Sequence, residues 1–168
     1  MLIKFIKDWV IPILIALVIT VLINKLLFFN IQVPTSSMYP TIKEGDRIAV
    51  LRVHNLSKLK HGDIVVFYSH ELKETLVKRL IGLPGDTVEI KEGEQVYLNG
   101  TKFEQDFSYS IDNYTGTFTV PEGCYFFLGD NRAGSYDSRK WNNPYILSED
   151  IMGRASIRIF PFNRFGKL

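Results

Sequence analysis

Apolar residues are distributed unevenly along the chain, and their pattern divides it into an N-terminal segment and a longer remainder. An uncharged apolar run extends from Trp9 to Ile23, and after two polar residues it continues to Phe29. A helix over this whole stretch would measure about 31 Å at ~1.5 Å per residue, which matches the ~30 Å hydrocarbon core of a bilayer. We therefore expect a transmembrane helix over residues 8–29.

The alternatives for this segment are a cleaved secretory signal and a buried core helix. The stretch Leu22–Lys25 lacks the small-residue pattern of a cleavage site, and the run is apolar on every face, unlike a core helix. Lys4 and Lys7 precede the run, so the positive-inside rule predicts a cytoplasmic tail over residues 1–7 and places residues 30–168 on the extracytoplasmic face. We expect an uncleaved, single-pass signal anchor in the cell membrane.

After residue 30 the pattern is typical of short β-strands separated by turns. Apolar or alternating runs predict strands over residues 47–51, 63–68, 75–81, 87–90, 95–98, 117–120, 124–128 and 155–160. Asn99-Gly100 is a strong signal for a two-residue hairpin. We expect a mainly β catalytic domain, an all-β sandwich or partly open barrel, in which residues 87–121 form a small cap or β-ribbon.

Composition and charge exclude several classes of function. The chain has 20 basic and 18 acidic residues and a net charge of +2, with no long block of like charges, which argues against a nucleic-acid partner. A single cysteine, Cys124, cannot form an intramolecular disulfide or a thiolate metal site. We interpret it as a small core residue, with a nucleophilic cysteine as the weaker alternative.

The histidines give no sign of a metal site or of a histidine-dependent hydrolase. The spacing of His54, His61 and His70 fits no metal motif, and no Gly-rich phosphate loop is present, so we expect neither a metal nor another cofactor. Spacing alone does not exclude a Ser-His-Asp triad, because triads assemble across a fold. However, the chain has no G-x-S-x-G elbow.

A serine and a lysine offer a different route to hydrolysis. A serine hydroxyl is a poor nucleophile until a base removes its proton, and lysine serves as that base only when it is neutral. Lys78 lies in the apolar run Thr75–Ile81, where burial would lower its pKa from the ordinary ~10.4. The other interpretation is an outward-facing strand residue beside Arg79, and spacing leaves both open.

Four sequence blocks point to a known family. In order along the chain they are Pro34–Thr41, Gly62–Phe67, Lys78–Asp86 and Gly129–Arg139. Together with the anchor, these blocks make the chain resemble a bacterial type I signal peptidase in its short, single-span form. Members of this family are serine proteases with a Ser/Lys dyad. The resemblance covers nearly the whole chain.

The resemblance assigns catalytic roles to the first and third blocks. It implies that Ser37 is the nucleophile and that Lys78 is the general base. It also implies an oxyanion hole made by the Ser37 backbone N–H and the hydroxyl of Thr35, a position where serine is common. Ser36 stands where glycine is frequent. These departures from the family pattern affect fine geometry and leave the assignment in place.

The resemblance assigns supporting roles to the last block. Ser135 matches the serine that hydrogen-bonds and orients the lysine, and Asp137 and Arg139 match an acid–base pair beneath the site. Outside this context the stretch Gly129–Arg132 would be interpreted as a turn. Orientation of a catalytic base by a neighbouring hydroxyl is physically reasonable, because the base must be held in a productive geometry.

The function implied by the resemblance is removal of N-terminal signal peptides from exported preproteins, at sites with small residues at the first and third positions before the cut. The expected partners are signal peptides and the lipid bilayer. The alternative is a non-catalytic chaperone for surface proteins that keeps the fold, although such relatives usually lack the serine or the lysine. A self-cleaving Ser/Lys regulator would be soluble and would bind DNA, which the anchor disfavours.

The aromatic stretch Phe160–Phe165 has two interpretations. Aromatic residues beside an arginine are typical of membrane interfaces, so the stretch is a candidate for contact with the bilayer. Alternatively, Phe160 and Phe162 close the core.

Overall fold

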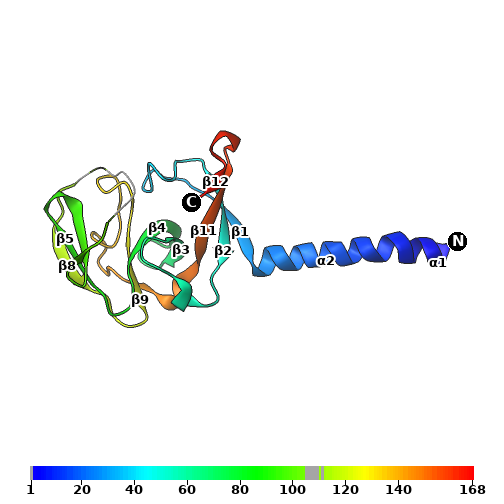
Figure 1. Cartoon of the computed structure of the whole chain (residues 1–168), viewed down its shortest axis with the longest axis horizontal. Helices are drawn as coiled ribbons and strands as arrows, with labels where there is room; N and C mark the ends of the chain where they lie inside the picture. Colours follow the sequence, from blue (N-terminus) through cyan, green and yellow to red (C-terminus); the bar gives the residue numbers. More distant parts are fainter. Residues whose placement is uncertain (1, 105–109, 111) are drawn as a thin grey trace.

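A long helix projects from a β-rich body in the computed structural model, which describes residues 2–104, 110 and 112–168 (Figure 1). The helix consists of α1 (Leu2–Phe5), the π-helical stretch η1 (Ile6–Val10) and α2 (Ile11–Leu26). Pro12 lies in the first turn of α2. Since proline has no N–H and its ring crowds the preceding turn, the wider π-helical turn directly before it relieves that conflict.

The segment Ile3–Ile23 is long and apolar enough to cross a membrane, with a mean hydropathy of 2.3 and none of its most apolar window buried. The helix ends at Leu26, so the expected span of residues 8–29 extends too far. Phe28 and Phe29 belong to the first strand, where they pair with Leu51 and Val50. Both phenylalanines are apolar, so the apolar run continues through them. Composition alone does not distinguish such strand residues from the end of an apolar helix.

A single residue, Leu27, connects the helix to the body. The Arg52 backbone N–H donates to the Leu27 carbonyl at 2.8 Å, and the Arg52 Nε donates to the Lys25 carbonyl at 3.2 Å. His54 Nε2 lies 3.1 Å from the Leu26 carbonyl. The last carbonyls of the helix, which have no partners within it, are thus bound by the domain itself.

The larger sheet has eight strands in the order β1-β2-β11-β3-β4-β9-β10, with β12 paired to β11. All of its pairings are antiparallel. Its strands are β1 (Phe28–Gln32), β2 (Arg47–Arg52), β3 (Ile64–Ser69), β4 (Glu74–Gly82), β9 (Cys124–Leu128), β10 (Ile146–Leu147), β11 (Ile151–Phe160) and β12 (Gly166–Lys167).

The smaller sheet has four strands in the order β7-β6-β5-β8 and lies on the side of the body away from α2 (Figure 1). Its strands are β5 (Thr87–Lys91), β6 (Gln95–Leu98), β7 (Thr101–Lys102) and β8 (Gly116–Thr119). The predicted hairpin turn is confirmed, because Asn99 and Gly100 both have positive φ and connect the pair Leu98 and Thr101. The part of the chain that was expected to form a small cap or β-ribbon contains this separate four-stranded sheet.

The remaining regular elements are short 3₁₀ turns. They are η2 (Leu56–Lys58), η3 (Glu92–Glu94), η4 (Ser148–Asp150) and η5 (Phe162–Arg164). After Leu26 the described residues form no α-helix, and the predicted mainly β class is confirmed. Four strands were not predicted. Three of them, β7, β10 and β12, have only two residues each, which show no period, and β1 follows directly on the apolar run that was assigned to the helix.

The core is divided by the larger sheet. Ile64 and Val66 of β3 pack in one cluster with Met38, whereas Val65 and Phe67 pack on the opposite face in a second cluster. A third cluster joins β9 to the strands of the smaller sheet. Because β3 is buried on both faces, its sequence is a continuous apolar run with no alternation.

Candidate active site

Ser37 lies in the segment that connects β1 to β2, and that segment is anchored at both of its ends. The Val33 N–H donates to the Asp46 carbonyl at 2.9 Å, and Met38 is fully buried in the core. Ser37 itself is 7% exposed. Its Oγ lies 3.3 Å from the hydroxyl oxygen of Thr35. The sequence therefore places two neighbouring hydroxyls on a fixed backbone.

The loop that follows β9 holds Ser37 from its carbonyl side. The Asn131 N–H donates to the Ser37 carbonyl at 3.0 Å, and the Asn131 side-chain amide donates to the Ser36 carbonyl at 3.3 Å. A Cβ on Gly129 would lie 2.6 Å from the Ser37 carbonyl oxygen and would also collide with Ser135. Only glycine allows this close approach. Steric crowding therefore explains why the fourth block begins with Gly129.

Lys78 is buried, with 3% of its surface exposed, so the outward-facing interpretation is wrong. It pairs in register with Val65, which belongs to the apolar cluster of Phe127 and Trp141. Burial lowers the pKa of Lys78 from 10.5 to about 8. Nearby carboxylates, foremost Asp137, oppose this shift and keep it from being larger.

A cavity of about 270 Å³ joins the Ser37 segment to β4. Its walls are Ile31, Gln32, Val33, Pro34, Thr35 and Ser37 from the one side and Glu74, Thr75, Leu76 and Val77 from the other. In this half of β4, from Glu74 to Lys78, β3 is the only strand partner within the described chain, whereas β9 pairs with residues 79–82. The backbone of β4 is thus unpaired on one side beside the cavity.

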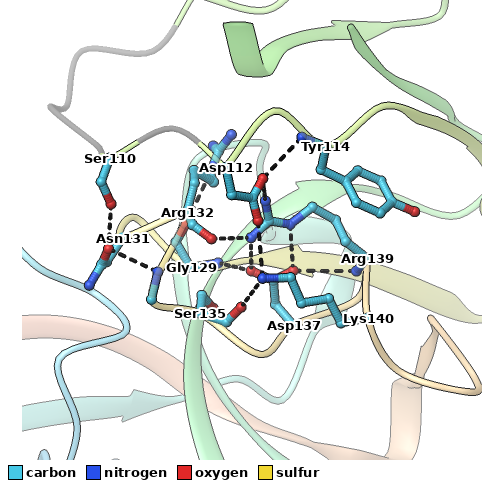
Figure 2. Close-up of polar contacts among 11 residues, drawn as sticks. Ser110, Asp112, Tyr114, Gly129, Asn131, Arg132, Ser135, Asp137, Arg139 and Lys140 are labelled. Atoms are coloured by element: carbon cyan, nitrogen blue, oxygen red, sulfur yellow. Dashed lines mark hydrogen bonds and ion pairs between the residues drawn. The ribbon is translucent and has the colours of Figure 1, made fainter. Parts of the chain in front are cut away.

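Asp137 and Arg139 form a buried ion pair in the segment that follows β9 (Figure 2). Arg139 Nε donates to Asp137 Oδ1 at 2.8 Å and one terminal nitrogen donates to Oδ2 at 2.9 Å. Asp137 Oδ2 also accepts from the Gly129 N–H at 2.9 Å, and Arg139 donates to the Arg132 carbonyl at 2.7 Å. The pair therefore fixes the loop that contacts Ser37.

Ser135 is 2% exposed and packs against Gly129, but its hydroxyl has no hydrogen-bond partner among the described residues. Its expected contact with Lys78 is not formed here. Likewise, within the described residues no hydrogen bond joins Ser37 to Lys78. Hydrogen bonds between catalytic groups are often long in the absence of substrate and tighten when it binds. Both contacts stay predictions.

A second buried ion pair, Arg79 with Asp130, was missed by the sequence reasoning. Arg79 Nε donates to Asp130 Oδ1 at 2.7 Å, and another guanidinium nitrogen donates to the Gly62 carbonyl at 2.7 Å. Because Arg79 follows Lys78, this pair ties the lysine strand to the loop after β9. One signal for this pair was present in the sequence. Arg79 is the second residue of the third block, and Asp130, of opposite charge, is the second residue of the fourth block.

The remaining candidate residues lie in ordinary structural contacts. Cys124 is buried in β9, as expected for a core residue. His61 is bonded to Asp86 at 2.7 Å and His70 to Asp150 at 2.9 Å. Neither histidine–aspartate pair includes Ser37, whose Oγ has Thr35 as its partner.

Comparison with known proteins agrees with the ordered blocks. The family model described as "Signal peptidase, peptidase S26" matches residues 6–160. The chain belongs to the signal peptidase family. Signal peptidase I T of Bacillus subtilis is 38% identical over 93% of this chain and 86% of its own length. Signal peptidase IB of Staphylococcus aureus is 37% identical over 96% of this chain and 93% of its own length.

A solved structure supports the same family and fold. The crystal structure of a signal peptidase I from Enterococcus faecalis matches with a TM-score of 0.50 and 35% identity, over 60% of this chain and 98% of that chain. Membership in the signal peptidase family makes the protein a hydrolase of the serine endopeptidase type, as the resemblance implied.

Proposed function

We propose that the protein is a membrane-anchored signal peptidase that removes signal peptides from exported preproteins with a Ser37/Lys78 dyad. The observation that carries this proposal is a lysine with a pKa of about 8, buried on the strand whose preceding residues form one wall of the Ser37 cavity. A lysine in that state is neutral in a large fraction of molecules at mildly alkaline pH. It is then a base of suitable strength for a serine hydroxyl.

The proposed reaction has two halves. Neutral Lys78 takes the proton from Ser37 Oγ, which attacks the scissile carbonyl carbon, and the resulting ammonium then protonates the leaving amine. An ester between Ser37 and the signal peptide remains. Lys78, neutral again, removes a proton from a water molecule that attacks this ester, and the ammonium returns that proton to Ser37 as the ester breaks.

We assign the oxyanion hole to the Ser37 N–H and the Thr35 hydroxyl. Among the described residues the Ser37 amide donates to no other group, so it is available to a developing negative charge. The Thr35 hydroxyl lies 3.3 Å from Ser37 Oγ, close to where that charge would form. Two donors fixed in advance stabilise an oxyanion at little cost in reorganisation.

The site favours an extended peptide with small side chains. The unpaired side of β4 can bind a substrate backbone as an added strand, which is a common way to hold peptides. The walls from Ile31, Val33, Leu76 and Val77 are apolar, and the cavity holds only about 270 Å³. These features support a preference for alanine-sized residues at the first and third positions before the cut.

The helix supports anchoring of the domain at the membrane. Lys4 and Lys7 before the apolar run support the proposed orientation, with residues 1–7 in the cytoplasm and the catalytic domain on the other side. Tethering raises the effective concentration of the enzyme near precursors that are themselves held in the bilayer. The exposed Phe160, Phe162 and Phe165, which are 44%, 81% and 64% exposed, do not close the core. Their contact with the bilayer is part of the proposal.

The test is cleavage of a preprotein by the full chain in detergent, comparing wild type with Ser37→Ala and Lys78→Ala. We expect each variant to lose cleavage while retaining the fold, which the near-ultraviolet circular dichroism reports. Full activity in either variant would refute the dyad. A wild-type protein that binds the precursor and never cuts it would favour the chaperone alternative.

A further inference from the structure

A cluster of cationic side chains surrounds the point where the helix enters the domain. A cavity of about 250 Å³, which we name the joint pocket, has Leu51, Arg52, Val53, His54, Lys58 and Arg154 among its lining residues. Lys25 lies in the last turn of α2, and its backbone carbonyl accepts a hydrogen bond from Arg52 of the pocket. The pocket is distinct from the Ser37 cavity, with which it shares no lining residue.

The fold fixes the Arg52 side chain and the backbone of Lys58 in the joint pocket. The Arg52 guanidinium lies 4.7 Å from the centre of the Phe29 ring while its Nε donates to the helix. Lys58 ends the turn η2, which Asn55 caps by accepting from the Ser57 N–H at 3.0 Å. A ligand at this pocket therefore meets the positioned charge of Arg52, which reduces the entropy lost on binding.

The charge of the pocket is only partly neutralised by the protein. Arg154 lies 3.4 Å from Asp63, so its charge is partly compensated. Within the described part of the chain, Lys25, Arg52 and Lys58 form no ion pair with a carboxylate. The carbonyls at the helix end contribute partial negative charge to the pocket. One of them, the Lys25 carbonyl, already accepts a hydrogen bond from Arg52, which offsets part of that charge. An anion is therefore the natural ligand.

We propose that the joint pocket binds the phosphodiester headgroup of an anionic phospholipid. Arg52 of the pocket bonds to the last carbonyls of α2, where the apolar helix meets the body (Figure 1). If the helix crosses a bilayer, the pocket lies at the depth of the headgroups. Leu51 and Val53 give the pocket apolar walls, and the exposed apolar side chains of the adjoining helix can contact acyl chains. The inference rests on the proposed membrane anchoring.

The test measures lipid bound to the full chain by native mass spectrometry in non-ionic detergent at low ionic strength. The probes are phosphatidylglycerol and, as the zwitterionic comparison, phosphatidylcholine. We expect wild type to retain one phosphatidylglycerol in preference to phosphatidylcholine. Each cation near a lipid surface contributes about a fivefold gain in affinity, so Arg52→Gln with Lys58→Gln should weaken binding about 30-fold.

Two further variants control for charge and for folding. Lys91→Gln with Lys102→Gln removes the same charge from the smaller sheet, on the far side of the body, and should leave lipid binding unchanged (Figure 1). Lys58→Glu changes only one exposed side chain, so it should weaken binding without disturbing the helix junction. Equal weakening by the distal pair would overturn the proposal, since it would reveal a general charge effect.

Other ligands give different results. If inorganic phosphate displaces phosphatidylglycerol at equal concentration, the pocket binds free phosphate and the lipid proposal is wrong. If the Arg52/Lys58 variant has a raised KM for a preprotein in lipid-free detergent, the pocket binds polypeptide and the proposal is again wrong. Unchanged cleavage in that assay is the expected result. Loss of cleavage in Ser37→Ala tests the enzyme separately, so the two proposals fail independently.

Discussion

Replacing Lys78 with methionine should stabilise the domain at neutral pH, because the native lysine is held in a place that disfavours its charge. The pKa of Lys78 falls from 10.5 to about 8 on folding. Each unit of pKa corresponds to about 1.36 kcal/mol, so the protonated lysine costs the native state roughly 3 kcal/mol at pH 7. Methionine fills a similar volume without a charge, and the variant should recover most of this free energy.

The sign of the pH dependence follows from proton binding. Between pH 8 and 10.5 the unfolded chain binds the proton and the folded chain does not, so wild-type stability rises with pH. Below pH 8 both states are protonated and the full cost is present. The advantage of Lys78→Met should therefore shrink from about 3 kcal/mol at pH 7 to about 1.5 kcal/mol at pH 9.5.

The measurement is urea unfolding of the full chain in non-ionic detergent, followed by tryptophan fluorescence in a Trp9→Phe background, which leaves Trp141, 6% exposed, as the reporter. Lys102→Met is the matched control. Its side chain is half-exposed in the smaller sheet, so that variant should differ little from wild type at either pH. A Lys78→Met protein that is no more stable than wild type at pH 7, or whose advantage does not change with pH, would refute the claim that Lys78 is desolvated.

Three other predictions concern catalysis and the buried network. With Lys78 as base, kcat/KM for a fluorogenic peptide should rise about tenfold between pH 6 and 7 and level off above about pH 8, and a flat profile would contradict that role. Thr35→Val should lower kcat about 100- to 1000-fold, with Thr35→Ser near wild type; equal rates would remove this hydroxyl from the oxyanion hole. Arg139→Met leaves Asp137 buried and unpaired, so it should cost about 3–5 kcal/mol in urea unfolding, against a small effect for Lys140→Met.

The strands that were predicted correctly are those whose burial produces an apolar or alternating run of residues in the sequence. Val65 and Phe67 face one cluster and Val66 the other, so β3 is an uninterrupted apolar run. The start of β1 was assigned to the helix, because Phe28 is as apolar as the residues before it. Pairing with β2 decides its conformation, and no local pattern encodes a partner about twenty residues away.

The sequence could propose residues for the site, and these assignments stay predictions, but it could not give the geometry. Family motifs pointed to Ser37 and Lys78, but whether the lysine faces solvent depends on what covers its strand. β4 is buried on both faces over its second half, so alternation along it was uninformative. The pairing of Arg79 with Asp130 joins elements that are far apart in sequence. Such contacts are set by tertiary packing and not by local propensity.

The single-residue connection at Leu27 has a consequence for where precursors are cut. No slack chain separates the helix from β1, and hydrogen bonds from Arg52 hold the helix end to the sheet. If the helix is embedded as proposed, the reactive hydroxyl stands at one fixed height above the lipid. The distance between the membrane surface and the cleavage point of a precursor would then be set by the fold.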